Sequence, residues 1–420
     1  MRYAKRGRPA GRLFSSYDRV HLRFGFRLSR RALRKLTPDA GVYMDMARSL
    51  ARGEGFRLSV NLYQDWIGAS RTSVPYQQPI APLMFSPVAG GPHAVSAAII
   101  VNGFLTVAAM LGFFAAFARF LPSWKAALAL LPMAVSPAAY IVVSAPLAEP
   151  SSLVLIAWGF FFLFRARPRM AAAGLLMGLS VLARASNLFR VVGLATAVAL
   201  SLGRAGWKHA AVFSMTALAP FVVFDVFGRV FLGTGYPGYG LASKVYLMTR
   251  DYGGAIYHAA APSLTFGGQI GGAVLWKMLV LNSTAHLAGM ARSTGWIYFL
   301  PALAAFFVRL FADHQIHRWL SAFAYSQFFA LGFIYHFIGH LEVERYSLVP
   351  LALLPAVALM AEQRLDASWG RPAHRRLAVA AIVLLTCVWS GSRTIGLVAE
   401  DRRQYLDPDA RRTYFNEPSA

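Results

Sequence analysis

Residues 94–118 read AVSAAIIVNGFLTVAAMLGFFAAFA and contain no charged side chain. A helix needs about 20 predominantly apolar residues to cross the hydrocarbon core of a bilayer. This stretch is long enough to do so. It therefore predicts a transmembrane helix, and with it a protein that is built in a membrane.

Similar apolar runs recur along the rest of the chain. The further predicted spans are Ala126–Ala145, Leu147–Phe164, Met170–Ala183, Asn187–Leu202, His209–Leu232, Trp296–Leu310, Trp319–Ile338, Tyr346–Ala361 and Leu377–Leu397. Another candidate, Gly271–Met290, is interrupted by Lys277 and is interpreted as interfacial or re-entrant. The fold class expected is all-α: a polytopic integral membrane protein with about 10–11 transmembrane helices.

The composition of the 420-residue chain agrees with this fold class. Hydrophobic residues make up 57% and charged residues only 14% of the chain, whereas soluble domains carry about 25% charged residues. This excludes a soluble globular protein, a disordered chain and a coiled coil. The single cysteine, Cys387, excludes an intramolecular disulfide framework and a cysteine-based zinc site.

The net charge of +24 is concentrated at the N-terminus. Residues 1–36 hold twelve Lys and Arg against one acid, Asp18. The segment Val20–Leu36 cannot span, because each Arg at the bilayer centre costs about 2.5–3.5 kcal/mol. We interpret 1–36 as a basic arm, disordered or lying on the membrane surface, followed by a transmembrane domain over 37–397 and a polar tail over 398–420.

The charges of the connecting loops predict the orientation. Alternate loops carry 13 Lys and Arg against three acids, and the positive-inside rule places them in the cytoplasm. These loops are Arg119–Lys125, Arg165–Arg169, Gly203–Lys208, Arg309–Arg318 and Glu362–Arg376. The other face then carries a first outer loop over 39–93 with short helices, a long outer loop over 233–270, and most of the dispersed ionisable residues. In a membrane protein, a basic excess indicates cytoplasmic loops and anionic lipids rather than nucleic acid.

The first outer loop begins with TPDAGVYMDMARSLARGEGF, residues 37–56. Pro38 and Asp39 are expected to precede a helix that carries Tyr43 on one face and ends near Gly53 or Gly55. Asp39 has two interpretations: an N-cap, worth about 1 kcal/mol, or a general base that deprotonates an acceptor. Asp45 is the alternative base.

Three further motifs are predicted on the same face. PYQQPIAPLM, residues 75–84, holds Tyr76 and Gln78 in a stiff, proline-rich lead-in that either is only structural or forms the wall of a substrate groove. Ala148-Glu149-Pro150 places an acid where a helix dipole favours it. Gly174 and Gly178 form a GxxxG motif typical of close helix packing, and it leads to Arg184, which either binds phosphate or reaches for the headgroups.

The last motif is HFIGHLEVERY, residues 336–346. His336 and His340 share a helical face and could hold a divalent metal with further ligands, but two histidines alone are weak evidence, so no metal site is predicted. Arg345 and Tyr346 follow and would face lipid headgroups or a phosphate. The chain has no Walker loop, no GxGxxG after a strand and no HExxH, which argues against a nucleotide-driven enzyme.

Together these motifs resemble the GT-C superfamily of polytopic glycosyltransferases, in the branch with protein O-mannosyltransferases, the lipid A aminoarabinose transferase and rhizobial lipopolysaccharide galacturonosyltransferases. The resemblance covers roughly 37–360. It follows the family's order: Asp39–Tyr43, Gly53–Phe56, Tyr76–Pro79, Ala148–Pro150, Gly174–Arg184 and Arg345–Pro350. Ala40 departs from the family, which usually has an acid there, and so does the missing span before Asp39.

The resemblance implies an inverting transferase in a bacterial-type inner or plasma membrane, working on the extracytoplasmic face. It would move sugar from a polyprenyl-phosphate-linked donor to a lipid, glycan or protein acceptor. Asp39 would be the base, and Arg184 and Arg345 would hold the carrier phosphate. The other candidate binding residues are Tyr43, Tyr76, Gln78, Glu149, His340 and Tyr346. Two alternatives stay open: a non-catalytic GT-C-like protein, and a transporter or flippase of lipid-linked sugars.

Overall fold

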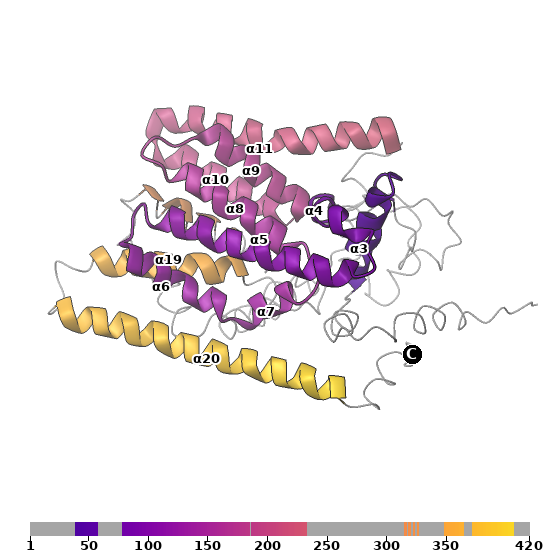
Figure 1. The fold of residues 1–420 in the computed structure, drawn as a ribbon. Coiled ribbons are helices and arrows are strands. Elements are labelled where there is room, and N and C mark those ends of the chain that lie inside the picture. The colour runs from indigo at the N-terminus through magenta and orange to yellow at the C-terminus, as the bar shows by residue number, and fades with distance from the viewer. Residues whose placement is uncertain are drawn as a thin grey trace, which may run out of the picture.

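The computed structural model describes residues 38–57, 78–184, 186–232, 315–316, 318–320, 322–323, 326, 348–364 and 372–406. Within these residues all regular elements are α-helices. They are α3 (Pro38–Ala51), α4 (Ile80–Ala89), α5 (Ala94–Phe117), α6 (Ser123–Ala134), α7 (Pro137–Val143), α8 (Glu149–Leu163), α9 (Met170–Ala183), α10 (Asn187–Ser201), α11 (Gly203–Leu232), α19 (Leu348–Arg364) and α20 (Pro372–Leu406). The short helices α3 and α4 lie together at one end of a bundle of longer helices (Figure 1).

Three segments of the described chain are long and apolar enough to cross a membrane: Ala94–Phe117, Ala205–Val230 and Ala381–Ala399. The shorter apolar helices are Ile80–Ala89, Glu149–Leu163, Met170–Ala183, Asn187–Ser201 and Leu348–Met360. The predicted all-α polytopic membrane protein is thereby confirmed. The predicted span 296–310, most of 319–338 and the candidate 271–290 lie outside the described residues.

The predicted span Ala126–Ala145 is broken into α6 and α7, which meet at an angle of 68°. Helix α6 ends at Ala134, and Ser136 caps α7, since its side chain accepts from Ala139 N at 3.1 Å. Pro137 follows at the first helical position, where a backbone N–H would have no acceptor within the helix, so its absence in proline costs nothing. The Val135 carbonyl at the break accepts a hydrogen bond of 2.7 Å from Thr394 Oγ1 of α20, as irregular backbone within a membrane protein requires.

Two helices extend beyond the predicted spans. Helix α11 begins at Gly203 rather than at His209, so the whole predicted cytoplasmic loop Gly203–Lys208 is helical. Helix α20 runs from Pro372 to Leu406, past the predicted span on both sides. The reason is that hydropathy marks only the apolar part of a helix, and a helix with satisfied backbone groups can continue into water.

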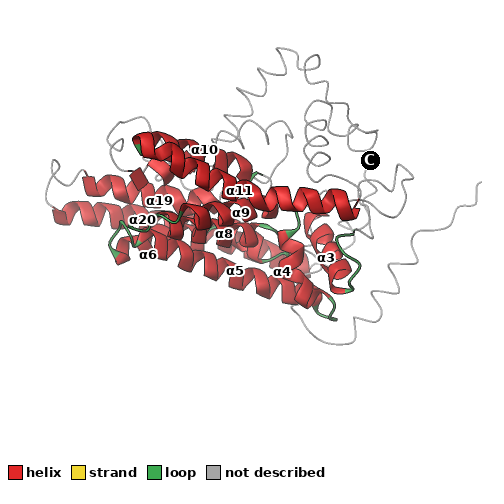
Figure 2. Cartoon of the chain, turned by 90° about the horizontal axis from the view of Figure 1, so that it is seen from above, coloured by secondary structure: helices red, strands yellow, loops and turns green. Residues whose placement is uncertain are grey.

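Helix α8 lies at the centre of the bundle, between α5 and α9 (Figure 2). Its Phe160 is fully buried and contacts rings from two other parts of the chain. The ring centroid of Phe160 lies 4.9 Å from that of Phe323 and 6.5 Å from that of Phe113. This aromatic core fixes the last turn of α8 in the bundle.

The GxxxG motif brings α9 onto α11. A Cβ added at Gly178 would lie 2.1 Å from the Ala217 carbonyl oxygen, and one at Gly174 would lie 2.3 Å from that of Phe213. Real Cβ atoms do not approach backbone so closely. The interpretation of this motif as a packing surface, typical of membrane helices, is confirmed.

We expect Gly178→Ala to lower the melting temperature of the purified protein. The added methyl group must push α9 and α11 apart, and such overpacking costs about 1–3 kcal/mol. The matched control is Gly103→Ala in α5, where a new Cβ meets nothing within 4 Å. Equal melting temperatures for the two variants would contradict the close approach of the helices.

The described parts of the predicted cytoplasmic loops lie at one end of the bundle. Lys125, from the first of these loops, forms an ion pair with Glu362, from the last. Trp319 directly follows the predicted loop Arg309–Arg318, and its Nε1 donates a hydrogen bond of 2.8 Å to Ser201 Oγ at the end of α10. The structure therefore groups these loops as the charge pattern predicts. Which side of the membrane they face remains a prediction from the charges.

We expect that orientation to appear in thiol labelling. In a Cys387→Ala background, Arg52→Cys should react with an impermeant reagent in intact cells, and Arg167→Cys should react only after permeabilisation. Both positions are exposed in the structure, so access to water does not limit either reaction. The reverse pattern of labelling would invert the predicted topology.

Candidate functional site at one end of the bundle

Helix α3 carries the candidate base in its first turn. The sequence had suggested that Asp39 precedes the helix. The helix begins at Pro38, however, so Asp39 lies inside it. Proline is preorganised for the first helical position, and an acid in the first turn is favoured by the helix dipole. The helix ends before Gly53 and Gly55, whose φ angles of 73° and 77° favour glycine. The Asp39 residue is half-buried.

Two of the predicted binding residues, Tyr43 on α3 and Gln78 shortly before α4, are buried. Tyr43 is only 4% exposed and belongs to an apolar cluster that includes Phe85 of α4 and Ala148. Gln78 is also buried, directly before α4. The cluster links α3 to the residue that precedes Glu149, so the structure brings the first and third sequence motifs to the same end of the bundle.

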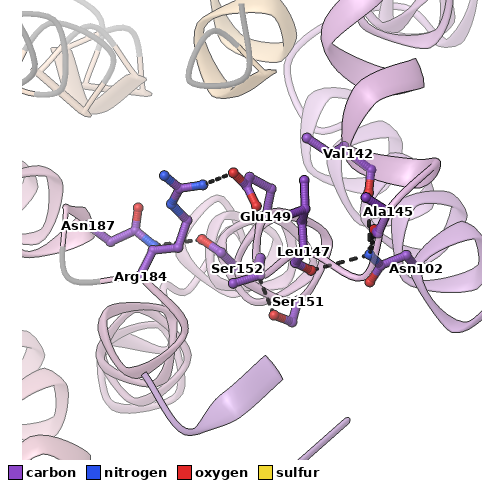
Figure 3. A network of polar contacts seen from close by, with 10 residues as sticks. Asn102, Val142, Ala145, Leu147, Glu149, Ser151, Ser152, Arg184 and Asn187 are labelled. Carbon is purple, nitrogen blue, oxygen red and sulfur yellow. Dashed lines mark hydrogen bonds and ion pairs between the residues drawn. The ribbon is translucent and has the colours of Figure 1, made fainter. Parts of the chain in front are cut away.

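The turn before α8 is held by a buried amide. Asn102, in the middle of the run that begins at Ala94, donates through Nδ2 to the Ala145 carbonyl at 2.7 Å. It also lies 3.3 Å from the carbonyls of Val142 and Leu147. Figure 3 shows the side chain facing the turn from one side. The turn that presents Glu149 is therefore fixed to α5.

Glu149 and Arg184, predicted as separate binding residues, form an ion pair. Glu149 opens α8, and its side chain is 5% exposed. Arg184 follows the last residue of α9 in an extended conformation, with φ −149° and ψ 117°, and its side chain is 12% exposed. The sequence could not show this pairing, because the two residues belong to different helices. The pair is largely removed from water, where an ion pair is screened less than at a surface.

Asn187, the first residue of α10, was given no role in the sequence analysis. Its Nδ2 donates to Ser152 Oγ at 2.6 Å and to the Ser180 carbonyl at 2.8 Å. The amide thus joins α8 and α9 close to the ion pair (Figure 3). A signal was present for Asn102, because a polar residue within an apolar run is costly in a membrane and indicates a specific partner or role. Asn187 stands among polar residues at the start of its helix, and the sequence carried no such signal for it.

No protein-family model matches the chain, and no curated protein is similar to it in sequence. Solved structures do match. The oligosaccharyltransferase of Archaeoglobus fulgidus, in complex with Zn and sulfate, is 14% identical with a TM-score of 0.54, over 85% of this chain and 49% of that one. ArnT of Cupriavidus metallidurans, bound to undecaprenyl phosphate, is 14% identical with a TM-score of 0.51, over 88% of this chain and 68% of that one.

The chain has a GT-C-like fold. It spans about half the length of the Archaeoglobus oligosaccharyltransferase. The fold expected from the ordered sequence motifs is thereby confirmed, and the chain is an integral membrane protein. At this level of identity the likeness concerns the fold, and the chemistry must be argued from the residues.

Within the GT-C-like fold, part of the predicted site lies outside the described residues, namely Tyr76, His340, Arg345 and Tyr346. Among the described residues, no three metal-ligating side chains gather, and the Glu149 carboxylate is engaged by Arg184. The described residues alone therefore do not form a divalent-metal site. What they do provide is a half-buried carboxylate on α3 near the end of the bundle where an arginine is held.

Proposed function

We propose that this protein is a membrane glycosyltransferase that moves a sugar from a polyprenyl-phosphate-linked donor to a lipid, glycan or protein acceptor on the extracytoplasmic face. The observation that carries the proposal is the placement of Asp39, Glu149 and Arg184 at one end of an apolar bundle of GT-C-like fold. Two solved proteins of similar fold, an oligosaccharyltransferase and a protein bound to undecaprenyl phosphate, support it.

The site contains a candidate for each of the two groups that the reaction needs. A hydroxyl or other acceptor must lose its proton as its oxygen or nitrogen attacks C1 of the sugar, and Asp39 is the candidate to take that proton. The bond between C1 and the phosphate oxygen breaks with inversion. The polyprenyl phosphate leaves with the electron pair of that bond and gains negative charge at the leaving oxygen.

Arg184 is the candidate to hold the carrier phosphate, because a guanidinium matches the geometry of phosphate oxygens. Its ion pair with Glu149 supports this role in a specific way. An arginine side chain has many rotamers, and holding it in one of them before the donor arrives lowers the entropy lost on binding. Arg345 remains a second candidate from the sequence.

The test is turnover of a defined donor by the purified protein in liposomes. Undecaprenyl phosphate carrying a radiolabelled sugar is incorporated, and candidate acceptors are added to the outside. Transfer appears as loss of label from the carrier lipid and its gain by an acceptor. We expect transfer with at least one sugar and no requirement for a nucleotide.

The same liposomes separate the two alternatives. A flippase would move the labelled lipid between leaflets, which an impermeant sugar-oxidising reagent detects, and would leave the label on the carrier. A non-catalytic protein would do neither. Either of these two results, across a panel of donor sugars and acceptors, would contradict the proposed transferase.

A further inference from the structure

Two buried asparagines near the Glu149–Arg184 pair share an unusual pattern of hydrogen bonds. Asn102 and Asn187 are both fully buried. Each donates through Nδ2 to at least one carbonyl oxygen on another helix or turn. Each has an Oδ1 that is buried with no partner among the described residues. Because carbonyl oxygens only accept, the donating amide group must face them.

This arrangement costs stability. A buried carbonyl oxygen without a donor loses about 1–3 kcal/mol of hydration, and leucine would fill a similar volume without that cost. Neither asparagine is explained by packing alone. What leucine could not provide is a pair of N–H groups that reach two elements at once.

Asn187 is hydrogen-bonded to the backbone around Arg184 through both its side chain and its own backbone N–H. Its side chain donates to the Ser180 carbonyl at 2.8 Å, and the same carbonyl accepts from Arg184 N at 2.9 Å. Its own backbone N donates to the Arg184 carbonyl at 3.0 Å. On the other side, its amide reaches Ser152 Oγ at 2.6 Å, one turn after Glu149 on α8. One side chain therefore joins the turn that carries the arginine to the helix that carries the glutamate.

We propose that Asn187 is a positioning residue: by tying the first turn of α8 to the last turn of α9, it sets the Arg184 guanidinium against the Glu149 carboxylate. Asn102 supports this from the opposite side, since it fixes the turn before α8. The effect on donor binding rests on the proposed function, because it requires that Arg184 hold the carrier phosphate. The effect on the ion pair does not.

The first test is a double-mutant cycle of Asn187→Leu and Glu149→Gln, measured as melting temperature. If Asn187 positions Arg184 against Glu149, the ion pair is already weakened in Asn187→Leu. Adding Glu149→Gln to that variant then lowers the melting temperature by less than it does in the wild type. We expect the double variant to melt within roughly 1 °C of the lower single variant. Additive or larger losses would overturn the proposal. This measurement needs no enzymatic activity.

A milder cycle covers the outcome in which Asn187→Leu does not fold. Ser152→Ala removes one acceptor of Asn187 and keeps the other. The matched control is Ser151→Ala, since Ser151 is similarly buried but donates to the nearby Ala148 carbonyl at 2.8 Å. Coupling to Glu149→Gln is expected for Ser152 and not for Ser151. Equal coupling of both serines, or none, would overturn the proposal.

The kinetic arm separates this inference from the proposed function. Asn187→Leu should raise the donor KM about tenfold and change kcat by less than about threefold. In the Glu149→Gln background the same substitution should change KM by less than about twofold. An equal rise in both backgrounds would overturn the positioning role. If the wild type turns over no donor, the proposed function fails, and the melting cycle still decides whether Asn187 positions the pair.

Discussion

Asp39→Asn is expected to abolish sugar transfer while the protein keeps its fold. A general base contributes about 10²–10⁴-fold to a rate, and an amide cannot accept the proton of the acceptor. Asp39 lies in the first turn of α3, where loss of its favourable interaction with the helix dipole costs only about 0.3–1 kcal/mol, so α3 should remain. The measurement is label transfer from the carrier lipid together with the melting temperature of the same preparation.

The control is Asp45→Asn on the same helix. Asp45 is six residues after Asp39, so at 100° per residue the two acids lie about 120° apart around α3 and point in different directions. We expect Asp45→Asn to retain most of the activity. Activity lost only in Asp45→Asn would move the base to Asp45. Full activity in both variants would contradict the base mechanism.

The helices were predictable because apolar runs bounded by charged residues mark the helices of a membrane protein, including ones shorter than a full span. The start of α9 at Met170 and its end at Ala183 match the prediction, and the GxxxG motif correctly indicated a close approach. The break at Ser136 was not predicted. Hydropathy does not respond to a serine followed by a proline, although this pair is a good helix start.

The candidate site was predictable in its residues and not in its contacts. Glu149 and Arg184 were both chosen from motifs, yet no pattern in one sequence says that they pair. Asn102 was overlooked because a single amide in an apolar run is a weak signal beside a charged residue, and Asn187 because it stands among other polar residues at the start of a helix. Their importance follows from partners that lie far away in the sequence, which only the fold brings together.

The ion pair makes Glu149→Gln the variant with the largest expected loss of stability. Removing one partner of a buried ion pair takes the opposite charge away from the other partner, which costs about 3–5 kcal/mol. Both side chains are largely shielded from water, so solvent can replace little of the lost interaction. We expect a clear fall in melting temperature and in the yield of folded protein.

A second substitution separates the cost of the stranded charge from the loss of function. In Glu149→Gln with Arg184→Met, no uncompensated charge of this pair remains, and replacing a whole buried pair by neutral groups is often close to neutral for stability. The double variant should therefore melt higher than Glu149→Gln alone, but it should bind the donor poorly because the guanidinium is gone. If the double variant melts lower than Glu149→Gln alone, then loss of the ion pair does not explain the instability of Glu149→Gln. One that melts higher and still transfers sugar at the full rate would remove Arg184 from the donor site and leave the pair a purely structural role.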